Sequence, residues 1–307
     1  MTPSGHEHTY TGLAEALGGR AVTISARGLE FEGYELLPPG AESLADCTKL
    51  PVVILHGWPG FAGTWRQAAV TLSRQGHPVL SYDMRGVSPA ARTEDVHGYT
   101  GHNLGDDLLA IADAHGYGRF HLLAHSWGAW VGWHATGDRP DRFASFVSLA
   151  TPHPQATYTA AAMSSQQGRL LAPFRRVLRD PAAARSKLLG NDAAVLRGFY
   201  DGRTPPALVD EDVARYLEGD TLEASMRLHA ALAIVDRDDE YVCEVPTLFF
   251  WGSEDRFFSR LAFGLTGDYV AADYKPVEVA GATQWVGIDA HAFVMKTSLE
   301  WFAKHET

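Results

Sequence analysis

Several features that mark other classes of protein are scarce or absent in this chain of 307 residues. Its two cysteines, Cys47 and Cys243, lie far apart in sequence, so we expect two unpaired thiols in a reducing cytoplasm, although one disulfide is left open. No apolar run approaches the ~20 residues that cross a bilayer. The first 20 residues lack a basic stretch followed by an apolar core, so we expect no signal peptide.

Basic residues are also fewer than acidic ones. The chain has 26 Lys and Arg against 37 Asp and Glu, and the net charge of −11 argues against binding to nucleic acid or an anionic membrane. His6 and His8 have no third ligand nearby, so we expect neither a metal ion nor another cofactor. With 46% apolar and 21% charged residues, the composition is that of a globular protein with a large core.

Strand and helix patterns alternate along most of the chain, which indicates an α/β fold with a mainly parallel sheet covered on both faces. We expect an antiparallel hairpin at residues 21–36 and further strands at 50–56, 77–83, 120–124, 143–150, 247–252 and 274–279. Apolar spacing predicts helices at 61–74, 102–115, 127–136 and 290–304. These elements predict an eight-stranded sheet.

Residues 152–238 break this alternation. They contain no convincing strand, and Gly190, Gly202 and the Pro205–Pro206 pair interrupt their helical patterns. The helices expected there lie at 156–167, 182–189, 192–200 and 209–217. We therefore expect a helical cap over the carboxyl ends of the strands, inserted between two parts of the core at 1–151 and 239–307.

Three segments that follow expected strands carry groups suited to catalysis. The sequence AHSWG places Ser126 in a sharp turn between a strand and a helix, as for a nucleophile, although a helix-capping serine is the alternative. The sequence HGWPG offers the backbone N–H of Trp58 to a developing oxyanion, as a partner for the N–H of Trp127. The last segment delivers the carboxylate of Asp255.

These segments together resemble the α/β-hydrolase superfamily and, within it, the epoxide hydrolase and haloalkane dehalogenase branch. The segments 127–132 (WGAWVG), 139–142 (RPDR) and 151–154 (TPHP) are similar to that branch as well. The resemblance runs from about residue 20 to the C-terminus and is weakest in the cap. It implies a core with a helical cap and a pocket between them.

Three positions depart from the pattern of that branch. The turn carries Ser126 where the branch usually has aspartate, and Gln284 stands where the family has its catalytic histidine. In the cap, His229 stands where the family carries an epoxide-activating tyrosine. Ser126, Asp255 and Gln284 would therefore form an incomplete Ser-His-Asp triad.

The missing histidine bears directly on the reaction. A serine hydroxyl needs a base within hydrogen-bond reach, and a glutamine amide cannot accept its proton. Removing the histidine of an intact triad lowers the rate by about 10⁴- to 10⁶-fold. An ordinary ester or epoxide hydrolase would thus need a substitute base, for which His125 and His229 are the candidates, or a natural histidine that Gln284 replaces.

We therefore expect a cofactor-free enzyme that acts on a flat hydrophobic small molecule between core and cap without hydrolysis. An oxyanion hole in a dry cavity suits cyclisation, carbon–carbon coupling, elimination or cofactor-free oxygenation. Gln284 would bind substrate, and Asp255 would orient whatever replaces the base. The substrate-binding side chains that we expect are His56, Trp58, Tyr200, His229 and Trp285.

Two alternatives stay open for the function. One is an ester or epoxide hydrolase with a substitute base, and the other is a catalytically silent member that only binds a ligand. The sequence also leaves monomer and homodimer open.

Overall fold

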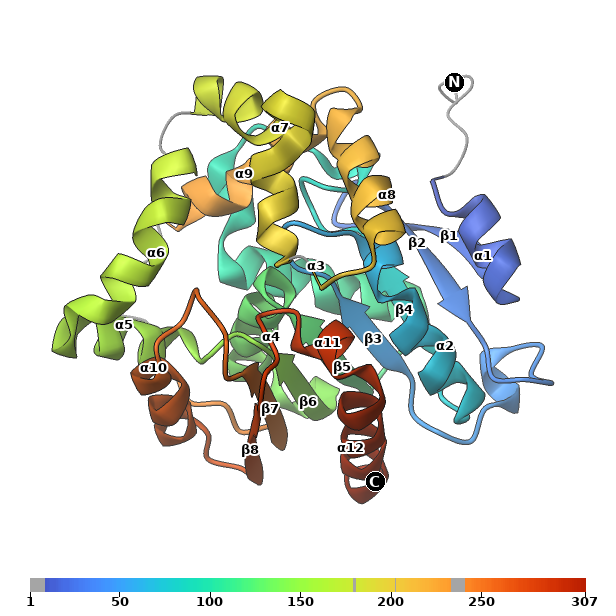
Figure 1. The fold of residues 1–307 in the computed structure, drawn as a ribbon. Coiled ribbons are helices and arrows are strands. Elements are labelled where there is room, and N and C mark those ends of the chain that lie inside the picture. The colour runs from blue at the N-terminus through green and yellow to red at the C-terminus, as the bar shows by residue number, and fades with distance from the viewer. Residues whose placement is uncertain (1–8, 179–180, 202, 233–240) are drawn as a thin grey trace.

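A computed structural model describes residues 9–178, 181–201, 203–232 and 241–307 (Figure 1). His6, His8 and the expected end of the cap at residue 238 lie outside these ranges.

The core is an eight-stranded sheet with the strand order β1-β2-β4-β3-β5-β6-β7-β8. β1 pairs with β2, and β2 with β4, in antiparallel fashion, and the other neighbours are parallel. The strands are β1 (Arg20–Ala26), β2 (Leu29–Leu36), β3 (Val52–Leu55), β4 (Val79–Tyr82), β5 (Phe120–His125), β6 (Phe143–Leu149), β7 (Thr247–Gly252) and β8 (Tyr274–Val279). The α/β-hydrolase fold with an eight-stranded, mostly parallel sheet is confirmed.

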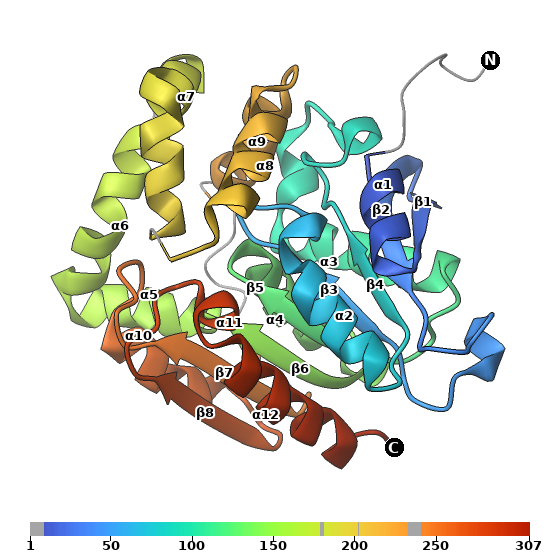
Figure 2. The same cartoon turned by 45° about the vertical axis from the view of Figure 1, so that its right-hand side comes forward.

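Helices cover both faces of this sheet (Figures 1 and 2). α2 (Arg66–Arg74) and α12 (His291–Lys304) contact each other on one face, and α3 (Gly101–Ala114) and α4 (Trp127–Asp138) contact each other on the opposite face. Each face has its own buried apolar cluster because β3, β5 and β6 carry almost continuous apolar sequence, as parallel strands between two helix layers do. The first turn of the expected 61–74 helix is instead a 3-10 turn, Ala62–Trp65.

Within the described ranges, five helices form the insertion, and Figure 2 shows those after the first one above the sheet. They are α5 (Pro154–Met163), α6 (Ser165–Leu178), α7 (Pro181–Arg197), α8 (Pro206–Leu217) and α9 (Thr221–Ala231). The expected helix at 156–167 is wrong at Ser164, whose extended backbone ends α5 and whose hydroxyl accepts a hydrogen bond from the Gln166 N–H at 3.2 Å. The expected break near Gly190 is a kink within α7.

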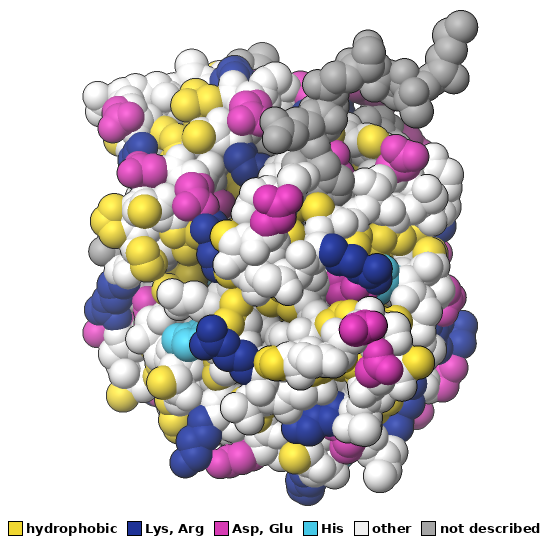
Figure 3. Space-filling view, turned by 90° about the vertical axis from the view of Figure 1, so that its right-hand side faces the viewer, with side chains coloured by type: hydrophobic (Ala, Val, Ile, Leu, Met, Phe, Trp, Pro, Cys, Tyr) yellow, Lys and Arg dark blue, Asp and Glu magenta, His cyan; other side chains and the backbone are white. Residues whose placement is uncertain are grey.

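Three short helices complete the described core: α1 (Thr11–Leu17), α10 (Arg260–Leu265) and α11 (Val286–Asp289). Within the described ranges, every helix is too short or too polar to cross a bilayer. Cys47 and Cys243 are both free thiols. On the face drawn in Figure 3, acidic and basic side chains are interspersed and the apolar patches between them are small.

Candidate active site

The turn between β5 and α4 holds Ser126 in a strained conformation. Its backbone has φ 53° and ψ −117°, a region that residues with a side chain adopt at a cost of about 1–3 kcal/mol. The hydroxyl of Thr151 donates to the Ser126 carbonyl at 3.1 Å, and the Ser126 N–H donates to the Leu149 carbonyl at 3.2 Å. Such strain persists only where the surroundings enforce it, and it presents the hydroxyl at the end of the strand.

The loop after β3 lies directly against this turn. A Cβ atom added to Gly57 would lie 2.5 Å from Cβ of Ser126, and one added to Gly128 would lie 2.6 Å from the carbonyl oxygen of His56. Only glycine permits this approach, which brings the following residue, Trp58, to the turn. Trp127 is the first residue of α4, so its backbone N–H has no acceptor within the helix.

The carboxyl group of Asp255 follows β7 and is only half satisfied. Its Oδ1 accepts hydrogen bonds from the N–H groups of Phe257 at 2.7 Å and Phe258 at 3.0 Å. Its Oδ2 is shielded from solvent and has no hydrogen-bond partner. Loss of hydration raises the pKa of this carboxyl group to about 7. In a complete triad, a carboxylate oxygen accepts the Nδ1–H of the catalytic histidine.

Gln284 lies in the loop between β8 and α11. Within this loop, both the N–H and the hydroxyl of Thr283 donate to Oδ2 of Asp289, at 2.7 and 2.6 Å. The Gln284 carbonyl lies 3.1 Å from Nε2 of His125, which ties the loop to the end of β5. The side chain of Gln284 is buried and lines the same cavity as Ser126.

A cavity of about 180 Å³ lies between the core and the cap. Aromatic and aliphatic side chains make up most of its wall, and none of the described residues that line it is charged or is a histidine. The lining residues are Trp58, Pro59, Ser126, Trp127, Trp130, Thr151, Pro152, Pro154, Thr157, Tyr158, Ala161, Gln167, Gly168, Leu171, Phe199, Leu232, Phe257, Phe258 and Gln284. An apolar wall with a few polar groups at one end is typical of a small-molecule site.

Four of the expected substrate-binding side chains do not line this cavity. His56 is fully buried, and its Nε2 accepts the Met84 N–H at 3.0 Å. Trp285 stacks on Tyr200 with ring centroids 4.8 Å apart, and the Tyr200 hydroxyl donates to Asp212 at 2.9 Å. His229 is the fourth. Of the five side chains, only Trp58 faces the cavity.

Both candidates for a substitute base are engaged by other groups. The His125 ring lies between the indoles of Trp65 and Trp285, with centroids 5.0 and 4.9 Å away, and burial lowers its pKa to about 4. Nε2 of His229 already accepts the indole N–H of Trp127 at 3.0 Å, and burial lowers the pKa of His229 to about 3. These contacts of His125 and His229 are thus with groups other than the Ser126 hydroxyl.

Gln167 of α6 is a site residue that sequence reasoning missed. Its Nε2 donates to the Phe257 carbonyl at 2.9 Å, and its Oε1 accepts the Ser259 N–H at 2.8 Å. Both bonds tie the cap to the loop that presents Asp255. No motif surrounds Gln167, and the bonds join positions about 90 residues apart, so the sequence carries no signal for them.

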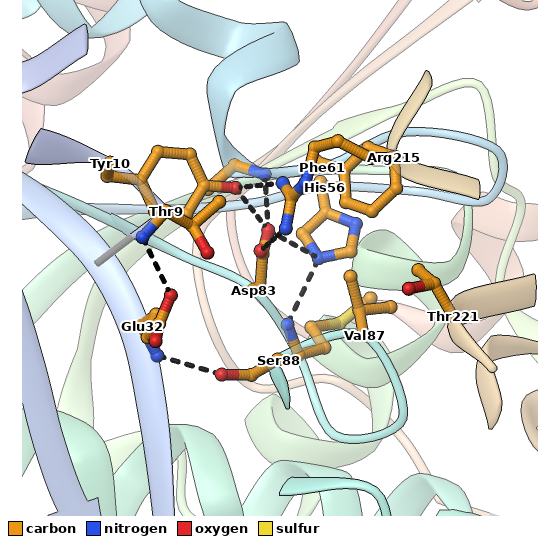
Figure 4. A network of polar contacts seen from close by, with 12 residues as sticks. Thr9, Tyr10, Glu32, His56, Phe61, Asp83, Val87, Ser88, Arg215 and Thr221 are labelled. Carbon is orange, nitrogen blue, oxygen red and sulfur yellow. Dashed lines mark hydrogen bonds and ion pairs between the residues drawn. The ribbon is translucent and has the colours of Figure 1, made fainter. Parts of the chain in front are cut away.

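A second tie joins the cap to the core through Asp83, beyond the end of β4 (Figure 4). Arg215 of α8 donates to Oδ2 of Asp83 at 2.7 Å, while the Tyr10 hydroxyl and the Ala62 N–H donate to Oδ1 at 2.6 and 2.9 Å. The Arg215 guanidinium also lies 3.9 Å from the centre of the Phe61 ring. Burial would raise the pKa of Asp83, but the charge of Arg215 and these hydrogen bonds hold it below its usual value.

Comparisons with known proteins agree with this architecture. A family model described as alpha/beta hydrolase fold matches residues 51–263. Epoxide hydrolase A of Mycobacterium tuberculosis (strain ATCC 25618 / H37Rv) is 33% identical and is aligned over 91% of this chain and 95% of its own. The AB hydrolase superfamily protein YfhM of Bacillus subtilis (strain 168) is 27% identical over 81% of this chain and 89% of its own.

Solved structures show the same fold at lower identity. Epoxide hydrolase VrEH1 from Vigna radiata has a TM-score of 0.74 at 19% identity and covers 93% of this chain and 98% of its own. A mutant epoxide hydrolase from Bacillus megaterium, in complex with a naphthyloxy-propanediol product, has a TM-score of 0.77 at 17% identity and covers 92% and 100%. The chain therefore belongs to the α/β-hydrolase superfamily, in its epoxide hydrolase-like branch, and it is an enzyme.

Proposed function

We propose that this enzyme converts a neutral, hydrophobic small molecule in the cavity between core and cap by stabilising a developing oxyanion, without the proton relay of a hydrolytic triad. The backbone N–H groups of Trp58 and Trp127 hold the oxyanion, and the Ser126 hydroxyl donates a further hydrogen bond. The Gln284 amide binds a polar group of the substrate. Asp255 does not line the cavity and would act only through a group that binds its unpartnered Oδ2.

The engagement of both candidate histidines by other groups carries this proposal. His125 and His229 are both engaged elsewhere, and both have a lowered pKa. A serine without a base is a poor nucleophile near neutral pH. Fixed N–H donors in a site that excludes water still stabilise an oxyanion without a base, because they need no reorganisation when charge develops.

The cavity wall supports an uncharged, largely apolar substrate. Burying an unpaired charge against such a wall would cost several kcal/mol. A cavity of about 150 Å³ is enough to hold benzene, so the 180 Å³ here suits an aromatic ring with a short substituent. In cyclisation, carbon–carbon coupling, elimination or cofactor-free oxygenation, the donors of this site would stabilise an enolate or alkoxide oxygen of the substrate. The proton that the substrate loses would pass to another atom of the substrate or to a water molecule bound with it, since no described lining residue is charged or is a histidine.

Epoxide hydrolysis is the second candidate, and the 33% identity to Epoxide hydrolase A favours it. A Ser126 without a base argues against the covalent route, since ring opening by a hydroxyl also needs a proton acceptor. Turnover of an aryl epoxide by the unaltered enzyme would favour this candidate over the first.

Restoring the base tests the proposal directly. The substitution Gln284→His would place an imidazole between the unpartnered Oδ2 of Asp255 and the Ser126 hydroxyl. We expect the unaltered enzyme to hydrolyse a para-nitrophenyl ester near the background rate, and Gln284→His to raise kcat/KM by at least ~10²-fold. Gln284→Leu is the matched control and should stay at background.

Two results would overturn the proposal. One is ester hydrolysis by the unaltered enzyme at the ~1–10³ s⁻¹ typical of intact enzymes. The other is a Gln284→His gain that survives Ser126→Ala, because the serine would then take no part in the chemistry.

A further inference from the structure

One cap helix contacts the side chains of both residues whose N–H groups form the proposed oxyanion hole. α9 carries Ser225 and His229 one turn apart, so that both face the core. The indole N–H of Trp58 donates to Oγ of Ser225 at 3.0 Å, and the indole N–H of Trp127 donates to Nε2 of His229 at 3.0 Å.

The His229 ring also lies nearly perpendicular to both indoles. Its centroid lies 4.8 Å from that of Trp58 at 81° and 4.8 Å from that of Trp127 at 83°. This is the arrangement that aromatic pairs prefer. Each indole thus makes both a hydrogen bond and a ring contact with the same cap helix.

The protonation state of His229 fits this role. An imidazole that accepts a hydrogen bond at Nε2 must be neutral. Burial lowers the pKa of His229 to about 3, so the ring is neutral over the physiological range. The lone pair that a general base would use is therefore already occupied by Trp127.

The two tryptophans depend on these contacts to different extents. Trp127 begins α4, whose helical hydrogen bonds hold its backbone. Trp58 follows β3 in a segment that is neither helix nor strand, so its side-chain contacts contribute more to its position. Besides α9, the Trp58 indole contacts Phe199 and Tyr216 of the cap, with centroids 5.7 and 6.2 Å away.

We propose that α9 is the element that sets the oxyanion hole, with Ser225 and His229 as positioning residues for Trp58 and Trp127. The hole has its working geometry only while α9 lies against the core, so cap closure and catalytic competence are one event. This inference rests on the proposed function. A shift of about 1 Å in a catalytic group costs roughly 10²-fold in rate. Displacement of either indole would therefore lower the rate by moving the backbone N–H of the same residue.

The test uses para-nitrophenol as a probe, because its phenolate absorbs visible light and carries the charge that the hole should bind. Titration of the bound probe against pH gives its pKa in the complex without any turnover. Donors that face the phenolate oxygen offset the apolar wall, so the unaltered enzyme should bind phenolate in preference to phenol. We expect His229→Leu and Ser225→Ala each to raise the pKa of the bound probe by about one unit, a tenfold loss of that preference.

Conservative variants separate positioning from simple loss of packing. His229→Gln keeps an acceptor for the Trp127 indole and should change phenolate affinity by less than about threefold. Glu94→Gln is the matched control, because it removes the negative charge that Glu94 places 2.7 Å from Arg227 of α9 without touching either indole. Thermal unfolding of each variant shows that it is folded at the assay temperature.

The outcomes are distinct. Phenolate preference in the unaltered enzyme that persists in both His229→Leu and Ser225→Ala would overturn the role of α9 and leave the proposed function standing. Binding of phenol in preference to phenolate by the unaltered enzyme, or no binding, would remove the oxyanion hole itself and the inference with it.

Discussion

Asp83 and Asp255 occupy equivalent places in the fold and have opposite surroundings. Each follows the carboxyl end of a parallel strand, β4 or β7. Asp83 is paired on both oxygens, by Arg215 on one and by Tyr10 and the Ala62 N–H on the other, and its pKa is lowered. Asp255 is paired on one oxygen only, and its pKa is raised to about 7.

The difference is the one that we expect between a structural carboxylate and a functional one. A shielded charge is tolerated when its hydrogen bonds are complete, as at Asp83. A buried carboxyl group with an unpartnered oxygen destabilises the fold. Such a group calls for an explanation, and a further group that acts on the carboxyl at a functional site is one. The unpartnered Oδ2 of Asp255 is the atom that we expect a histidine at position 284 to bind.

The largest effect should come from giving Oδ2 of Asp255 a hydrogen-bond partner and then removing the carboxylate. In the Gln284→His background, Oδ2 of Asp255 would accept the Nδ1–H of the new imidazole and fix its tautomer. Adding Asp255→Asn should then remove most of the gained ester hydrolysis, about 10²- to 10⁴-fold in kcat. An unchanged kcat in the double variant would show that Asp255 does not reach position 284.

Removing one partner of the fully hydrogen-bonded Asp83 carboxylate should lower stability rather than activity. Arg215→Met leaves the Asp83 charge buried without its cation, and the free energy of unfolding should fall by about 3–5 kcal/mol in urea titration. The control is Arg227→Met, whose partner Glu94 is 93% exposed; a surface pair of this kind contributes below about 1 kcal/mol. Equal effects of the two variants would contradict the contrast.

Asp255→Asn in the otherwise unaltered chain should raise the free energy of unfolding, and the gain should depend on pH. The folded pKa of Asp255 is about 7 against a model value of 3.8, so its ionisation destabilises the folded state as pH rises from ~4 to ~7. Asparagine should therefore stabilise the protein by about 2–3 kcal/mol above pH ~7, and the gain should vanish below pH ~4. Stabilisation independent of pH would point to a cause other than charge.

A buried group away from the cavity sharpens the comparison. Both ring nitrogens of His134 are buried without a hydrogen-bond partner, and burial lowers its pKa to about 3. Because the unfolded chain takes up a proton below pH ~6.5, His134 destabilises the fold increasingly as pH falls from there to ~3. His134→Leu should recover about 2 kcal/mol at pH ~5 relative to neutral pH, seen as a higher Tm. A Tm difference that does not grow toward acid would contradict it.

The core was predictable from sequence because its signals are local. Apolar runs that end in Gly-containing turns mark β3 and β5, and the turn around Ser126 follows from residues within one segment. The six residues of α10 offer too few turns for a periodic pattern, and the sequence gives no sign of α9 as a separate helix. The geometry of the cap depends on contacts between distant positions, such as Gln167 with Ser259.

The same reason explains the errors within the site. Tyr200 and Trp285 are of the residue types that line substrate pockets, yet they stack on each other outside the cavity. The sequence indicates His229 as polar and near the cavity, but its bond to the Trp127 indole becomes visible only when α9 is placed on α4. Gln284 was singled out because it follows the last expected strand, where the family has its histidine, and its role there stays a prediction.

The close approach of the two loops at Gly57 and Gly128 has a practical consequence for redesign of this enzyme. Neither position has room for a methyl group, so randomised libraries that include them would consist almost entirely of unfolded or misassembled members. Leu171 and Leu232 line the cavity from the cap and take no part in the turn at Ser126. Directed evolution toward new substrates should begin there.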